Sequence, residues 1–78
     1  MPRRIVYRVL KVGDRWWVRR DEEPAADFRT KNAAVMAATR LALQVHQDGH
    51  DAQLVVHHED GTIEAERTYG HDPFPPRG

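Results

Sequence analysis

The sequence predicts an α+β fold in which a single helix covers one face of a small β-sheet. Apolar residues recur at helical spacing in only one stretch, residues 30–48. Two strand-like segments precede this stretch and two follow it, and each pair is joined by a short glycine-containing turn. A chain of 78 residues has room for one core, so we expect all these elements to pack together.

The first pair of predicted strands spans residues 5–12 and 15–20, which are rich in residues that favour strands. Gly13-Asp14 suits a two-residue type II′ turn, which places Leu10 opposite Trp17 and Val9 opposite Val18. Because side chains alternate along a strand, the hairpin has two distinct faces. One face carries Ile5, Tyr7, Val9, Trp16 and Val18. The other carries Val6, Arg8, Leu10, Val12, Trp17 and Arg19.

Residues 21–29 are predicted to form a loop that leads into the helix. The stretch opens with three acidic residues, and Pro24 lacks the N–H that regular strand pairing uses. Phe28 precedes the expected N-cap, Thr30, by two residues, so we expect its ring to pack under the first helical turn.

The predicted helix runs from Thr30 to Asp48, and Gly49 follows where a left-handed C-cap residue is favoured. Its expected core face consists of Ala34, Ala38, Leu41 and Val45. Met36 and Leu43 lie nearly opposite that face, one heptad apart. They are either scattered exposed apolar residues, which are common, or a second contact surface.

The second pair of predicted strands spans residues 52–58 and 62–69, with the Asp60-Gly61 turn between them. The element order is therefore β-β-α-β-β, a two-layer arrangement with a four-stranded, mainly antiparallel sheet. Numbering the strands along the chain, a right-handed crossover favours the all-antiparallel order 2-1-3-4. The order 1-2-3-4, with a parallel central pair, is the alternative. In both orders one sheet face has no helix on it.

Residues 1–70 are predicted to form this domain and residues 71–78 an extended, proline-rich tail. Within the tail, Phe74 either serves as a peptide ligand for another protein or packs with Tyr69 on the sheet. The chain has no cysteine, and Arg8 and Lys11 interrupt the only N-terminal apolar run. We therefore expect a cytoplasmic protein without a signal peptide or membrane span.

The net charge is zero, but the charges are segregated along the chain. Residues 3–20 hold seven basic residues and only Asp14 as an acid, whereas residues 48–66 hold six acids and no Lys or Arg. This pattern fits ion pairs between strands of one sheet, a basic face for an anionic partner, or self-complementary association.

No pattern in the sequence indicates catalysis. The chain has neither serine nor cysteine and no glycine-rich phosphate loop. The neighbouring carboxylates Glu59 and Asp60 are explained by the turn that they form. Adjacent His57 and His58 point to opposite faces of a strand, and no histidine spacing is typical of zinc sites. We therefore expect no enzyme activity, no cofactor and no metal.

The residues left without an assigned role predict an interaction surface instead. These candidates are Val6, Arg8, Leu10, Trp17, Arg19, Met36 and Leu43. Aromatic residues and arginine are enriched in protein interfaces, so we favour a protein–protein contact, most simply a homodimer. The alternative is single-stranded nucleic acid bound by the basic, aromatic sheet face, although that face offers one ring where RNA-binding sheets offer two or three.

Several short segments together resemble a family of small bacterial proteins known only as a domain of unknown function. They are Trp16-Trp17-Val18, Phe28-Arg29-Thr30-Lys31, Ala34 with Ala37-Ala38, Leu54-Val55-Val56-His57, Asp60-Gly61-Thr62-Ile63 and Tyr69-Gly70-His71-Asp72-Pro73. The resemblance implies a compact α+β domain and supplies no reaction, cofactor or partner. The chain departs from the family pattern at Ala33, Met36 and Leu43, where such proteins tend to carry charged residues.

Overall fold

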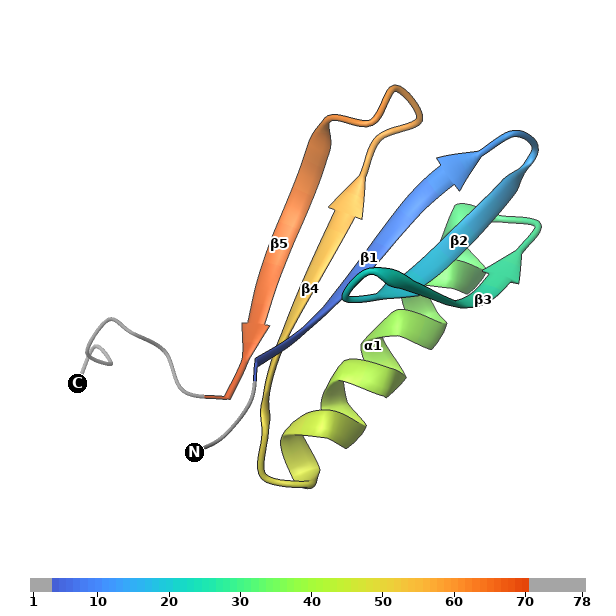
Figure 1. Ribbon diagram of the computed structural model, residues 1–78. Helices are drawn as coiled ribbons and strands as arrows, with labels where there is room; N and C mark the ends of the chain where they lie inside the picture. Colours follow the sequence, from blue (N-terminus) through green and yellow to red (C-terminus); the bar gives the residue numbers. More distant parts are fainter. Residues whose placement is uncertain (1–3, 71–78) are drawn as a thin grey trace.

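The computed structural model describes residues 4–70 and shows a five-stranded sheet with one helix packed across one face (Figure 1). The elements in chain order are β1 (Arg4–Val12), β2 (Arg15–Arg20), β3 (Glu23–Phe28), α1 (Lys31–Gln47), β4 (Asp51–His57) and β5 (Ile63–Tyr69). The α+β class with one helix is confirmed. The predicted tail, with Phe74, lies outside the described residues. In the described part of the chain, α1 is too short and too polar to cross a membrane.

The β1–β2 hairpin has the predicted register. Leu10 pairs with Trp17 and Val9 with Val18. Gly13 has a φ of +65° while Asp14 has no positive φ, as a type II′ turn requires. The predicted division into two faces is confirmed as well, because Trp16 is buried while Trp17 on the opposite face is half-buried.

The predicted loop between residues 21 and 29 is wrong for most of its length, because Glu23–Phe28 forms β3 at the edge of the sheet. Pro24 is tolerated there because the outer side of an edge strand needs no hydrogen-bond partner. A bulge also adjusts the pairing: Val18 pairs with Ala26 and Arg19 with Pro24, which leaves Ala25 as the extra residue.

Asp21 turns the chain from β2 into β3 and ties this turn to β1. Its φ of +53° is one that few residues other than glycine adopt. Its backbone N–H donates to the Val6 carbonyl at 2.7 Å, and its Oδ1 accepts from the Val6 N–H at 3.1 Å. These two bonds offset the backbone strain and hold the turn in place.

The sheet order is β3-β2-β1-β4-β5, so the predicted neighbours are right but the direction of the central pair is wrong. We expected four strands, all antiparallel, whereas β1 and β4 run parallel. The reason is β3, which reverses the chain once more before α1. The helix then returns the chain to the end of the sheet where β1 starts, which makes β4 parallel to β1.

The helix packs on the sheet through a stripe of alanines. Ala34, Ala38 and Ala42 have no exposed surface, and Val45 is buried beside them. Small side chains let the helix axis approach β1 and β4 closely. Leu41 was expected in this stripe and is instead 37% exposed at its flank, because the helix turns Ala42 toward the sheet.

Both predicted helix caps are confirmed. The Thr30 Oγ1 accepts from the Ala33 N–H at 3.2 Å. At the other end Gly49 has a φ of +93°, and the N–H groups of Gly49 and His50 donate to the carbonyls of His46 and Val45 at 3.0 and 3.1 Å. This bonding pattern is a Schellman motif. Phe28 packs against the core ahead of the helix, as predicted.

Candidate interaction surface on the open sheet face

The open face, as we call it, is the side of the sheet that α1 does not cover (Figure 1). Two rows of side chains on this face cross all five strands. The strand registers place in the first row Pro24, Arg19, Arg8, Val55 and Glu66, from β3 to β5. The second row, two residues further along, holds Asp27, Trp17, Leu10, His57 and Ile63. Leu10 and His57 are neighbours there because each follows the last parallel pair, Val9 and Val56.

A shallow apolar hollow of about 370 Å³ lies on the open face over β1, β2 and β3. Its lining consists of Leu10, Val12, Trp17, Arg19 and Pro24. The structure thus brings together three predicted site residues, Leu10, Trp17 and Arg19. Pro24 was not predicted as a site residue because its segment was interpreted as a loop. It joins the hollow only through the pairing of β3 with β2.

The remaining predicted residues on this face, Val6 and Arg8, lie further along β1. Val6 is half-buried, and Val55 on the neighbouring strand is only 3% exposed although no helix covers it. Val55 lies between Arg8 and Glu66, and the Gln53 Nε2 donates to the Glu66 Oε1 at 3.1 Å. Polar side chains therefore cover this part of the open face, and the apolar hollow lies further along the strands, around Leu10, Val12 and Trp17.

Arg8 and Arg19 lie directly opposite each other on adjacent strands. Like charges in such a pair repel, and in the described part of the chain neither guanidinium has a carboxylate partner. Arg19 Nη2 donates to the Glu22 carbonyl at 2.8 Å, whereas the nearby Arg15 Nε donates to Asp27 Oδ2 at 2.9 Å. The first row therefore carries two adjacent, uncompensated positive charges.

His57 lies between the Gly61 carbonyl and the Arg8 guanidinium. Its Nδ1 lies 2.8 Å from the Gly61 carbonyl, which only accepts, so this nitrogen carries the proton. Its Nε2 lies 3.3 Å from Arg8 Nη1, which only donates, so this nitrogen is the acceptor. The ring thereby orients Arg8 without compensating its charge.

Met36 and Leu43 lie on a different surface. They are 54% and 40% exposed on the side of α1 that faces away from the sheet. Both the helix and the sheet lie between that side of α1 and the open face (Figure 1). The seven predicted residues therefore form two surfaces and not one, because the sequence pattern shows a face of each element but not how the elements stack.

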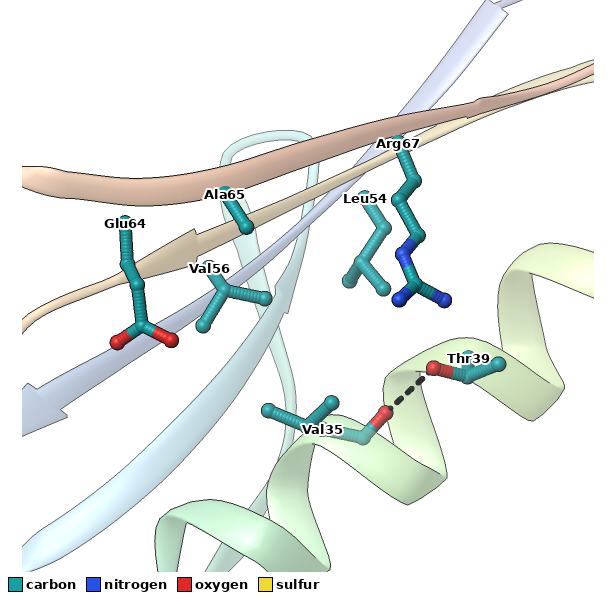
Figure 2. A pocket seen from close by; sticks show the side chains of 7 residues that line it. All are labelled: Val35, Thr39, Leu54, Val56, Glu64, Ala65 and Arg67. Atoms are coloured by element: carbon teal, nitrogen blue, oxygen red, sulfur yellow. Dashed lines mark hydrogen bonds between the residues drawn. The ribbon is translucent and has the colours of Figure 1, made fainter.

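A second concavity lies between α1 and β5 on the helix side of the sheet (Figure 2). Its floor is apolar, with Arg67 and Glu64 along one wall; the lining is Val35, Thr39, Leu54, Val56, Glu64, Ala65 and Arg67. Thr39 Oγ1 donates to the Val35 carbonyl at 2.8 Å. At about 170 Å³ it is less than half the size of the hollow on the open face and too small to receive a side-chain cluster from another protein.

Glu64 belongs to an ion-pair cluster at the rim of this groove. It pairs with Lys31 of α1 and lies 3.2 Å from the His58 Nδ1. The hydrogen bond from Lys31 lowers the pKa of the Glu64 carboxyl below its ordinary value of 4.5. No group of three His, Asp or Glu side chains within residues 4–70 is arranged to hold a metal ion.

Comparison with known proteins adds one assignment. No curated protein and no solved structure matches the chain significantly. A family model described as an uncharacterized protein conserved in bacteria matches residues 7–69, which extend from β1 to the last residue of β5. This match includes most of β1 and the whole of every other strand and of the helix. The chain therefore belongs to the DUF2188 family of uncharacterized bacterial proteins.

Proposed function

We propose that this domain is a non-enzymatic module that acts through protein contacts made by the open face, and that its partner is a second copy of the chain. The observation that carries the proposal is the hollow in which Leu10, Val12 and Trp17 lie beside Arg19. Tryptophan and arginine are the residues most enriched at the energetic centres of interfaces. The segregated charges favour a copy of the same chain as the partner, in the cytoplasm where we expect the protein.

Nucleic-acid binding through the same face is the second candidate. The opposed Arg8 and Arg19 beside Trp17 favour it, since single strands are bound by cations together with stacking rings. Glu66 and Asp27 on the same face oppose it, as does the net charge of zero. Flat tryptophan fluorescence during titration with mixed oligonucleotides at low salt would count against this candidate.

Light scattering across a concentration series tests self-association. We expect the wild-type chain to increase in mean mass with concentration and Trp17→Ala to weaken association about tenfold or more, as loss of a central interface ring does. Met36→Asp is the matched control, because it adds a charge to the other exposed apolar surface. A wild-type chain that stays monomeric at every concentration rejects the proposal.

A further inference from the structure

We infer that two copies pack open face to open face about a two-fold axis that runs parallel to the strands, between β1 and β4. The inference rests on the proposed function and adds the geometry of the pair. Such an axis places β1 of one copy over β4 of the other, and β2 over β5. Each row of side chains keeps its position along the strand direction, which we call its height. Two features of the open face, one charged and one apolar, are matched by this single operation.

The charged match lies in the first row. In that row Arg19 is on β2 and Glu66 on β5, each one strand outside the β1–β4 pair. The axis therefore places Arg19 against the partner's Glu66, and this happens twice in the dimer. Packed sheets lie about 10 Å apart, a gap that an arginine and a glutamate side chain extended from opposite sides can close.

This contact explains the opposed arginines. Like charges placed directly opposite on neighbouring strands destabilise a sheet unless a counter-charge lies nearby. In the described part of the chain no carboxylate pairs with Arg8 or Arg19. The partner's Glu66 supplies that charge at the position where it is missing, while Arg8 extends over the partner's Val55.

The apolar match lies in the second row. Ile63 on β5 is 52% exposed at the same height as Trp17 on β2. The same axis places the partner's Ile63 on the ring of Trp17, next to the hollow. The half-buried Trp17 and the exposed Ile63, which lie on either side of the β1–β4 pair, thus cover each other.

The other way to stack the two faces is unfavourable. A two-fold axis perpendicular to the strands keeps each strand over its own copy, so the basic half of one face covers the basic half of the other. The axis parallel to the strands is the one that places the basic half over the acidic half. It leaves the outer side of α1, with Met36 and Leu43, outside the interface.

Charge reversal tests this geometry. Arg19→Glu and Glu66→Arg should each raise the dimer dissociation constant about tenfold or more, because each change creates two repulsive contacts per dimer. The double variant Arg19→Glu/Glu66→Arg should restore the dissociation constant to within a few-fold of wild type. Arg40→Glu, on the exposed surface of α1, is the matched control and should leave it unchanged.

A mixing experiment adds an outcome that no general charge effect produces. When the two single variants are mixed, both Arg–Glu contacts form in the heterodimer and neither forms in the homodimers. Native mass spectrometry should therefore show the heterodimer in excess over the statistical half. A mixture of Glu66→Arg with Arg40→Glu carries the same net charges and should show no such excess.

The outcomes separate this inference from the proposed function. A wild-type dimer that Trp17→Ala dissociates, combined with a double variant that stays as weak as the single variants, overturns the two-fold geometry but leaves the open face as the contact surface. A monomeric wild-type chain overturns both. Far-UV circular dichroism and thermal unfolding of each variant establish that weak association does not come from misfolding.

Discussion

The two faces of the sheet are built on different principles, although the same strands supply both. The covered face, which packs on α1, holds the buried apolar residues of the core, and Glu64 and Arg67 lie on it only at the β5 edge. The open face mixes half-buried apolar side chains with Arg8, Arg19 and Glu66. Adjacent residues show the difference: Trp16 is 7% exposed in the core, while Trp17 lines a hollow. Burial within the chain accounts for the first face, and for the second we propose contact with a second copy of the chain.

The largest effect that separates the two faces should come from removing each tryptophan ring. Trp16→Ala should destabilise the fold by about 3–5 kcal/mol, because it leaves a cavity beneath the helix. Trp17→Ala should cost much less in the isolated domain, because its ring borders solvent. Urea unfolding of both variants at a concentration where the chain is monomeric, followed by far-UV circular dichroism, measures the difference.

Equal destabilisation by the two substitutions would contradict the division into a structural and an interacting face. If Trp16→Ala fails to fold, Trp16→Leu provides the same comparison. Leucine fills more of the space left by the ring, so the loss of folding stability should be smaller.

A smaller effect should distinguish the two sides of the helix. Ala38→Leu inserts a large side chain where α1 lies closest to the sheet and should destabilise the fold by about 1–3 kcal/mol. Leu43→Ala, on the outer side, should stay within about 0.5 kcal/mol of wild type. Thermal unfolding of both variants measures the contrast. A tolerated Ala38→Leu would show that the alanine stripe does not determine how closely the helix packs.

The smallest effect should come from the ion pair at the rim of the covered face. The pKa of Glu64 is lowered by Lys31, so the folded protein binds this proton more weakly than the unfolded chain does. The pair therefore stabilises the fold above pH 4.5, the pKa of an ordinary glutamate. This contribution is lost as the pH falls through the lower pKa that Glu64 has in the folded protein.

Glu64→Gln isolates that contribution. The variant should have a lower unfolding temperature than wild type near neutral pH, and the difference should shrink in acid as the wild-type carboxyl becomes protonated. The stacking of Lys31 over the Trp16 ring, at 5.7 Å, remains in both proteins and does not enter the comparison. A difference that is the same at pH 7 and pH 3 would show that the effect does not come from the charge of the carboxylate.

Local patterns predicted much of the fold. Alternation along residues 5–20 and the Gly13 turn predicted the β1–β2 register, and with it the face on which Trp17, Leu10 and Arg19 meet. Thr30 and Gly49 predicted both helix ends. Each of these features depends on residues close together in the chain, where turn geometry and side-chain alternation are sufficient.

The errors all concern which elements lie beside each other. Pro24 suggested a break, yet an edge position and a bulge accommodate it in β3. The missed strand then reversed the expected direction of β4 relative to β1. Leu41 was expected in the core, but Ala42 is buried there instead. The residue that faces the sheet depends on how the whole stripe of small residues packs on it.

The sequence by itself determined the composition of the two faces and the ends of most elements, because alternation, capping and turn preferences act over a few residues. The tertiary structure decided that Arg19 and Glu66 lie at the same height on either side of the parallel β1–β4 pair. That placement depends on strand order and direction, which follow from packing between segments far apart in the chain.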